Sequence, residues 1–392
     1  MPAVSPLQPV PRRSELAPPP PPRQGDAVPA APAPAPVASL PARPDAALQA
    51  ALDAAARRWG LSAAGIVLVE PATNRLAMRH GQVAFPAASV IKLPLLAAVQ
   101  EAIEAGRLDP AASVAVKAAN MTGTWSPPGD ARPHLRPGTR VSLATLQDVL
   151  ITRSDNVATN TLLDGLDRTA LAAGFSRWGA PATVLARKLS AGNTVRDDAS
   201  PGGRNRTTAL DMATMLVRLQ AGTLVSPAAS ARMKAILGRQ LDHDKIPAGL
   251  PRDARVYHKT GETSEVTHDV AIIEVAGRSY VLAVLTREAP GGNTWARIAG
   301  LTRDLHQAVL AAPATPAHPG GLPAAPPPLP GEPPQAGEEP ALAAPPPEAT
   351  AGPASLAPQA APRPVAAMLA GLAALAAGAS RVLGQLATRI PR

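Results

Sequence analysis

Proline is concentrated at the two ends of this chain, and its distribution confines any compact fold to the middle. Of the 392 residues, 48 are proline, with runs such as Pro18–Pro22 and Pro326–Pro328. Proline removes a backbone donor and fixes φ, so such stretches cannot build helices or sheets. We expect residues 1–44 to be a Pro/Ala-rich disordered tail and residues 313–364 to be a Pro-rich linker of polyproline character. Residues 45–312 remain, and they are enough for one compact domain.

The far C-terminal segment, residues 365–392, is apolar rather than Pro-rich. Its Ala/Leu-rich run, Val365–Ala379, is followed by Arg381, Arg389 and Arg392. The run is shorter than the ~20 residues that span a bilayer. Two interpretations stay open: an amphipathic helix that contacts a membrane or envelope surface weakly, or a weakly helical alanine-rich tail. The N-terminus lacks a charged start followed by an apolar core, so no secretory signal is apparent.

The composition argues against several classes of function. The formal net charge is +9, but Lys and Arg are scattered and aromatic residues make up 2% of the chain. Nucleic-acid binding needs clustered basic residues with stacking aromatics, so we expect none. The absence of cysteine excludes disulfides and thiolate metal sites. The Asp-His-Asp run at 242–244 has no second cluster to match it, so we predict an exposed loop there, and neither a metal nor a cofactor.

Apolar periodicity predicts strands at both ends of the domain and helices between them. The predicted strands are Ala64–Glu70, Arg75–Arg79, Arg255–Lys259, Thr267–Glu274 and Ser279–Thr286. Helical spacing covers residues 45–59, 90–106, 143–153, 158–166, 210–219 and 293–309. This order predicts an α+β fold: an antiparallel sheet built from both domain ends, flanked by the terminal helices, with an inserted all-helical subdomain. A cleft between the sheet and the subdomain is the natural place for a site.

Particular residues support the predicted helix ends and the packing around the cleft. Asp45 and Asn293 are the expected N-caps of the first and last helices, and Thr208 with Asp211 has the spacing of a capping box. His258 and His268 flank strands near the Lys-Thr-Gly element and are expected to be structural, with lining of the site as the alternative. Trp125 is expected to pack in the core, with the cleft rim as the alternative.

Ser89-Val90-Ile91-Lys92 lies where a loop enters an apolar helix. Residues three apart share a helix face, so the Lys92 amine can approach the Ser89 hydroxyl. A neutral amine there could take the serine proton, and burial or nearby cations would lower its pKa. Alone, the pattern is equally that of a serine capping a helix with a solvated lysine one turn later. It is, however, the only Ser-x-x-Lys in the chain.

Two further motifs follow in the sequence. Ser154-Asp155-Asn156 interrupts a helical pattern and could present a hydroxyl and an amide together, although all three residue types also cap helices. Residues 259–261, Lys-Thr-Gly, lie on or just after a predicted strand, where a cation and a hydroxyl could hold a carboxylate. Gly261 has no side chain, so the strand could lie close to a nucleophile. The two motifs, in this order after the sole Ser-x-x-Lys, arise by chance in on the order of one chain in a few thousand.

Together these three motifs resemble the signatures shared by class A β-lactamases and penicillin-binding proteins. The resemblance covers most of residues 46–311 and says nothing of the tails. It implies that Ser89 attacks a carbonyl and is acylated, with Lys92 as general base, directly or through water. It also implies that Ser154 relays a proton to the leaving nitrogen and that Asn156 binds the substrate amide.

The resemblance also assigns roles to the Lys-Thr-Gly strand. Lys259 and Thr260 would hold the substrate carboxylate, with Gly261 allowing close approach. The backbone N–H groups of Ser89 and Glu262 would form the oxyanion hole. The substrates of this family lie outside the cytoplasm, so an extracytoplasmic location is expected although no export signal is apparent.

One departure from the class A pattern concerns the water-activating glutamate on a loop after Ser-Asp-Asn. No glutamate occurs between Asn160 and Lys234. Asp197 or Asp198 could substitute, or both could belong to a solvated loop. Without such a base, acylation could proceed while hydrolysis stalls.

Three functions therefore remain in view. The first is a serine hydrolase that opens β-lactams through an acyl-enzyme. The second is a penicillin-binding or D-Ala-D-Ala carboxypeptidase-like enzyme that acts on peptidoglycan stem peptides. The third is a non-catalytic envelope scaffold whose tails are its working parts.

Overall fold

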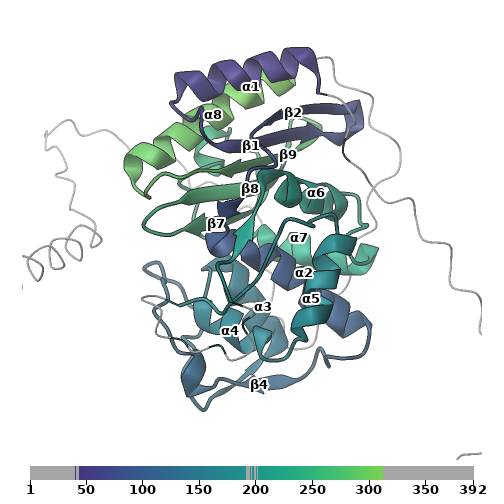
Figure 1. The fold of residues 1–392 in the computed structure, drawn as a ribbon, viewed down its shortest axis with the longest axis vertical. Helices are drawn as coiled ribbons and strands as arrows, with labels where there is room; N and C mark the ends of the chain where they lie inside the picture. The colour runs from purple at the N-terminus through teal and green to yellow at the C-terminus, as the bar shows by residue number, and fades with distance from the viewer. Residues whose placement is uncertain are drawn as a thin grey trace, which may run out of the picture. The chain divides into compact units, whose positions relative to one another are not determined.

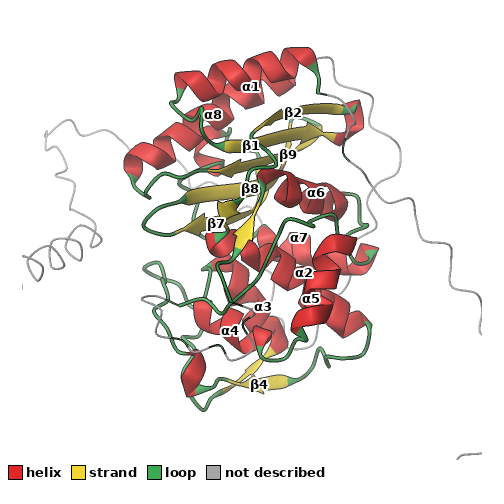
Figure 2. Ribbon diagram, viewed as in Figure 1, coloured by secondary structure: helices red, strands yellow, loops and turns green. Residues whose placement is uncertain are grey.

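The computed structural model describes residues 40, 44–190, 195, 197, 200 and 202–311, and its centre is a five-stranded antiparallel sheet (Figures 1 and 2). The strand order is β2-β1-β9-β8-β7. The strands are β1 (Gly65–Glu70), β2 (Arg75–Arg79), β7 (Arg255–Glu262), β8 (Thr267–Val275) and β9 (Arg278–Leu285). Strands from both ends of the domain meet where β1 pairs with β9, with Gly65 opposite Leu285. The predicted α+β sheet from two chain ends is confirmed.

Both faces of this sheet are covered, which explains why β1 is buried along its whole length. On one face, Ile66 and Leu68 pack with residues of α1 (Ala46–Arg58) and α8 (Gly292–Leu310). On the other face, Val67 and Val69 join the apolar core of the helical subdomain. Figure 1 shows α1 and α8 together above the sheet and the remaining helices below it.

The inserted subdomain is mainly helical, and α6 covers the sheet beside it (Figure 2). Its helices are α2 (Lys92–Glu104), α3 (Leu143–Thr152), α4 (Asn156–Leu163), α5 (Arg168–Arg177), α6 (Ala209–Gln220) and α7 (Pro227–Leu237). Two short ribbons accompany them: β3 (Phe85–Pro86) with β6 (Arg206–Thr207), and β4 (Ser113–Ala115) with β5 (Arg140–Ser142). The sequence pattern missed α5 and α7 because their alanine- and serine-rich faces give weak apolar periodicity.

The helix caps agree with the sequence in part. Asp45 accepts a hydrogen bond from the Leu48 N–H at 2.7 Å, as predicted. Thr208 caps α6 through the Asp211 N–H, but the Asp211 carboxylate accepts from Thr183 Oγ1 instead of completing the capping box. The prediction for Asn293 was wrong: the N-cap of α8 is Gly291, two residues earlier, because the φ of 156° at this glycine lets the chain enter the helix at Gly292.

The expectations for the tails lie outside the described residues, including the linker 313–364 and the segment 365–392. Within residues 44–190 and 202–311, none of the helices has the length and apolar character that a bilayer crossing requires.

Candidate active site

Ser89 lies on a single 3-10 turn, Ala88–Ile91, that leads directly into α2. The regular helix therefore begins at Lys92, two residues later than the pattern predicted. Ala88 has a φ of 43°, in the left-handed region that non-glycine residues avoid. Such backbone strain is typical of functional positions, where the surrounding structure holds it in place.

The Lys92 amine contacts oxygen atoms of Ser89, Ser154 and Asn156. Its Nζ lies 3.0 Å from Ser89 Oγ, 3.0 Å from Ser154 Oγ and 2.6 Å from the Ser154 carbonyl oxygen. It also lies 2.7 Å from Asn156 Oδ1. The amine thus joins two hydroxyls, one three residues from it in the sequence and the other 62 residues from it.

The environment of Lys92 favours its neutral form. The side chain is fully buried, and burial lowers the pKa of Lys92 well below its usual value. The charge of Lys259 lowers this pKa further, while Asp155 opposes the shift. A neutral amine within hydrogen-bonding distance of a serine hydroxyl can accept its proton.

The Ser154–Asn156 segment is the connection between α3 and α4. Ser154 has a φ of 60°, and this left-handed residue turns the chain so that its carbonyl oxygen and its hydroxyl both reach Lys92. Asp155 is the N-cap of α4 and accepts from the Ala158 N–H at 2.9 Å. Asp155 thus provides the cap, while the side chains of Ser154 and Asn156 contact Lys92.

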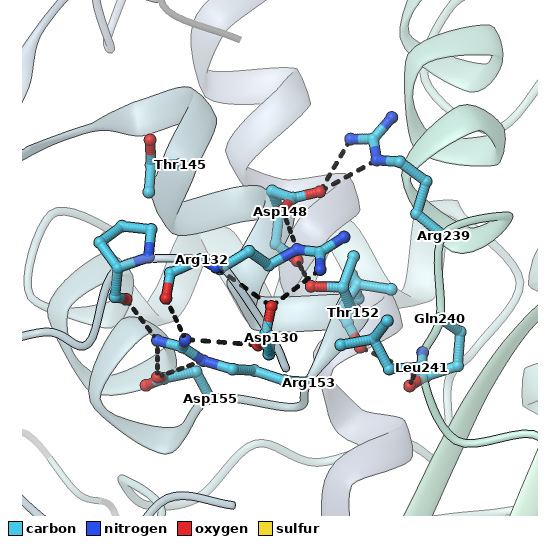
Figure 3. Close-up of polar contacts among 12 residues, drawn as sticks. Asp130, Arg132, Thr145, Asp148, Thr152, Arg153, Asp155, Arg239, Gln240 and Leu241 are labelled. Carbon is cyan, nitrogen blue, oxygen red and sulfur yellow. Dashed lines mark hydrogen bonds and ion pairs between the residues drawn. The ribbon is translucent and has the colours of Figure 1, made fainter. Parts of the chain in front are cut away.

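Behind this segment lies a buried set of ion pairs (Figure 3). Arg153, with 1% of its side chain exposed, donates to Asp155 Oδ2 at 2.9 Å and lies 3.6 Å from Asp130. Arg132 pairs with Asp130 at 3.0 Å and with Asp148 at 2.7 Å. Arg239 then pairs with Asp148, which ties the connection after α7 to α3. Sequence reasoning missed this network, and the only signal was an arginine two residues after the apolar run 149–151.

The Lys-Thr-Gly motif lies within β7, the free edge strand, against the turn that carries Ser89. A Cβ added to Gly261 would lie 3.0 Å from Ser89 N and 2.9 Å from Val90 N, so only glycine fits without a backbone shift. Burial lowers the pKa of Lys259 to about 7, against the raising effect of Asp242 and other nearby carboxylates. Lys259 Nζ donates to the Thr260 carbonyl oxygen at 2.7 Å.

Glu262, the residue after this motif, is held by its side chain on the α8 side of β7. Its Oε1 accepts from Trp295 Nε1 at 2.7 Å and lies 3.0 Å from the buried Lys245 Nζ. Lys245 also pairs with Asp242 at 2.6 Å. The loop predicted at 242–244 is therefore exposed only at its second and third residues, because Asp242 turns inward to the buried lysine.

The histidines near β7 are buried, as expected. His258 Nδ1 lies 3.0 Å from Asp269 Oδ1, and His268 accepts from the Thr286 N–H and contacts the Pro86 carbonyl oxygen. The prediction for Trp125 was wrong, since 51% of this residue is exposed in the loop between β4 and β5. In the described part of the chain, no three His, Asp or Glu side chains gather as metal ligands would.

A cleft of about 730 Å³ opens beside the nucleophile. Ser89 and Asn156 line it together with Glu262 from β7 and with a third segment that includes Leu189 and Asp197. The cleft therefore lies between the sheet edge and the helical subdomain, where the sequence placed it.

The third segment of the cleft wall contains Leu189 and also Asp197, one of the two candidates for the deacylating base. Asn160 of α4 accepts from the Leu189 N–H and donates to its carbonyl oxygen, both at 2.8 Å, so an apolar side chain is held in the cleft wall. Asp197 Oδ2 accepts from Arg168 at 2.8 Å and from the Lys188 N–H at 2.7 Å. Asp198 lies outside the described residues.

Known proteins share these features. The model of the Beta-lactamase enzyme family matches residues 45–309. A curated β-lactamase of Citrobacter koseri is 30% identical over 224 residues, which cover 56% of this chain and 73% of that protein. The structure of PBP-A is 25% identical, has a TM-score of 0.59, and is covered over 99% of its length by 69% of this chain. An ancestral class A β-lactamase (GNCA) is 29% identical with a TM-score of 0.57, and 67% of this chain covers 99% of it.

The match to the family model extends over more than half of the chain and spans the sheet, the helical subdomain and all three motifs. The solved relatives share the fold described above. This chain belongs to the beta-lactamase enzyme family and is a β-lactamase-like serine hydrolase.

Proposed function

We propose that this protein is acylated at Ser89 by β-lactams and that it hydrolyses the resulting ester slowly. The observation that carries the proposal is the contact of Lys92 Nζ with the hydroxyls of Ser89 and Ser154, both at 3.0 Å. One buried amine is thus within reach of the nucleophile and of a hydroxyl that can pass a proton onward. The role of each residue follows from this arrangement.

In the acylation step, neutral Lys92 accepts the proton of Ser89 Oγ as this oxygen attacks the lactam carbonyl. The C–N bond of the ring breaks, and the nitrogen must gain one proton. Ser154 Oγ donates that proton and takes one from Lys92 Nζ, so the lysine returns to its neutral form. The left-handed backbone at Ala88 and Ser154, imposed by the surrounding structure, places both hydroxyls within reach of the amine before substrate arrives.

The β7 side of the cleft would bind and stabilise the substrate. The N–H groups of Ser89 and Glu262 are the donors proposed for the developing oxyanion, and the lack of a side chain at Gly261 keeps β7 close to the Ser89 turn. Lys259 and Thr260 would hold the substrate carboxylate, with the lysine protonated below its pKa of about 7. The Asn156 amide, already oriented by Lys92, would bind the substrate amide.

Deacylation requires a second base to activate water, and two features of the cleft argue that it is slow. Leu189 presents a hydrocarbon side chain in the wall, and no glutamate occurs between Asn160 and Lys234. Asp197 is the carboxylate nearest to Leu189 in the sequence, but its Oδ2 already accepts two hydrogen bonds. An oxygen occupied in this way is a poor acceptor for a further proton.

A penicillin-binding or D-Ala-D-Ala carboxypeptidase-like role on peptidoglycan stem peptides is the second candidate. It is favoured by the missing glutamate and by the similarity to PBP-A. The scaffold interpretation is disfavoured by the complete set of hydrogen bonds around Lys92. Mature peptidoglycan and environmental β-lactams both lie outside the cytoplasm, so we propose that the domain works there.

The deciding experiment mixes the full-length protein with a chromogenic cephalosporin and follows colour and intact mass together. We expect a burst of one equivalent, a mass increase located on Ser89 by peptide mapping, and slow further colour. Ser89→Ala is the control and should give neither signal. Rapid turnover without a lasting adduct would contradict slow deacylation, and no adduct with any β-lactam would contradict the acylation proposal.

The second candidate is tested separately by incubating the same protein with a stem pentapeptide that ends in D-Ala-D-Ala. Release of D-alanine that depends on Ser89 would support a carboxypeptidase role. Release of none, together with a stable penicillin adduct, would restrict the second candidate to penicillin binding.

A further inference from the structure

Arg187 differs from the other charged residues that line the cleft. Six charged residues line the cleft, and five of them have a partner of opposite charge. Two of the five, Arg204 and Glu265, pair with each other at 3.7 Å. The other three pair with residues outside the lining: Lys188 with Asp164 at 2.6 Å, Asp197 with Arg168 at 2.8 Å, and Glu262 with Lys245 at 3.0 Å. Among the described residues, no carboxylate lies within ion-pairing distance of the Arg187 guanidinium. Among the residues that the structure describes, Arg187 is therefore the one charged group of the cleft lining without an ion-pair partner.

The backbone of Arg187 is fixed relative to the nucleophile. The side chain of the buried Asn205 accepts from the Arg187 N–H and donates to the Arg187 carbonyl oxygen, both at 2.9 Å. The Asn205 carbonyl oxygen accepts from the Ala87 N–H, also at 2.9 Å, two residues before Ser89. A single buried asparagine thus connects the Arg187 backbone to the start of the Ser89 turn.

This connection leaves the side chain available. All the bonds that hold Arg187 use its backbone, and its side chain is exposed and lines the cleft. A guanidinium carries a permanent charge and a planar pair of donors that matches the two oxygens of a carboxylate. A cation held at a set position, with no carboxylate partner in the described part of the chain, is a suitable binding group for an anion.

We propose that Arg187 binds a second carboxylate of the substrate, located on its acyl portion. This inference rests on the proposed function, since it assumes that the acyl donor enters this cleft. Lys259 and Thr260 would bind the carboxylate on the leaving-group side of the bond that breaks. They lie on β7, a different segment from Arg187. The preferred substrates are therefore acyl donors with two free carboxylates, either β-lactams or peptides.

A matched pair of penicillins tests this proposal. Benzylpenicillin and carbenicillin differ by one carboxylate on the acyl side chain. Non-covalent affinity is measured by calorimetry in the full-length Ser89→Ala protein, and acylation rates by intact mass in the protein with Ser89. Arg187→Gln should weaken carbenicillin binding about tenfold, the loss expected for one charge-assisted contact, and benzylpenicillin binding less than about twofold.

Two further variants separate geometry from charge. Arg204→Gln removes the same charge from the same cleft, where the arginine already has a carboxylate partner, and should change both affinities less than about twofold. Arg187→Lys keeps the charge without the planar pair of donors and should recover only part of the carbenicillin affinity.

The outcomes are distinct. Equal affinity for the two penicillins, equal losses for both on Arg187→Gln, or binding of neither would each overturn the Arg187 proposal. Carbenicillin selectivity in Ser89→Ala protein without any adduct on Ser89 in the native protein would support the Arg187 site and contradict the acylation proposal. Selectivity in both measurements would support both.

Discussion

The two sides of the cleft are built in different ways. The Ser154 wall, residues 154–156, is backed by the buried ion pairs that run from Asp155 to Arg239 (Figure 3). In the Leu189 wall, which comprises the described residues 187–190, 195, 197, 200 and 202–205, the side chains of Asn160 and Asn205 hydrogen-bond to the backbone of Leu189 and Arg187. The first wall carries groups proposed for acylation, and the second is where a deacylating base would stand.

This contrast has a physical consequence. Acylation needs two hydroxyls and an amine aligned to within a fraction of an ångström, and a buried network that is satisfied at every contact restricts such movement. The Leu189 wall needs only to set the shape and the charge of the cleft. A few hydrogen bonds from side chains to the backbone are enough to hold it for that purpose. Substitutions in the second wall should therefore alter turnover and selectivity without loss of the fold.

The largest effect is expected from Arg153→Met, which breaks the Ser154 wall. Removing this cation leaves the buried Asp155 without its cationic partner, while Asp130 keeps Arg132 at 3.0 Å. The loss of the buried pair should lower the free energy of unfolding by about 3–5 kcal/mol. Chemical denaturation measures it. The matched variant for the Leu189 wall is Arg168→Met, which removes the α5 cation paired with Asp197 at 2.8 Å. Asp197 keeps the hydrogen bond from the Lys188 N–H, so the cost should be smaller, about 1–3 kcal/mol. Equal losses in the two variants would contradict the comparison.

The next effect is a gain of function in the Leu189 wall. Leu189→Glu places a carboxylate beside the acyl-enzyme and should accelerate deacylation about 10²-fold, within the range of a positioned general base. The decay of the benzylpenicillin adduct, followed by mass, measures this rate. Leu189→Gln is the control of equal shape without the carboxylate, and deacylation that is equally fast in both variants would exclude base catalysis from this position.

The acylation side should also respond to pH. Lys259 loses its charge as the pH rises through about 7, so the acylation efficiency with benzylpenicillin should fall by up to about tenfold for each pH unit above it. Benzylpenicillin methyl ester, which has no carboxylate for Lys259 to hold, should lack this fall. A stopped-flow or quench pH profile of both compounds decides the point, and parallel profiles would remove Lys259 from carboxylate binding.

The smallest effect belongs to the exposed pair at the rim of the Leu189 wall. Arg204 and Glu265 lie 3.7 Å apart, with side chains 72% and 69% exposed. Arg204→Gln should change the free energy of unfolding by less than about 0.5 kcal/mol because solvent screens such a pair. Thermal or chemical denaturation checks this value, and a loss near that of Arg153→Met would mean that both walls depend on their charges.

The sequence predicted the elements that local chemistry defines. The strands of the sheet follow from the local apolar pattern, and they are present. The Ser89–Lys92 contact follows from a spacing of about one helical turn, and it is present as well. The position of Gly261 against the Ser89 turn was also foreseeable, because only glycine allows a strand so close. The fold class followed from the order of strands and helices, which the motifs reinforced.

What the sequence could not provide was the pairing of residues distant along the chain. Nothing in the sequence near Arg153 indicates that it meets Asp130, and Asp242 looked solvated until Lys245 was seen to be buried. Leu189 was inconspicuous because an apolar residue in a loop carries no chemical signal. Its importance appears only when Asn160 is seen to hold it in the cleft wall.

The sheet built from both chain ends, described above, determines when this enzyme becomes reactive during its synthesis. Ser89 and Lys92 emerge from the ribosome early, but the strand that closes on Ser89 is β7, and β1 finds its partner β9 later still. Closing such a long loop is slow, and contacts of this kind form late in folding. A nascent or truncated chain therefore carries the nucleophile without the strand beside it, so the serine should stay chemically silent until translation of the domain is nearly complete.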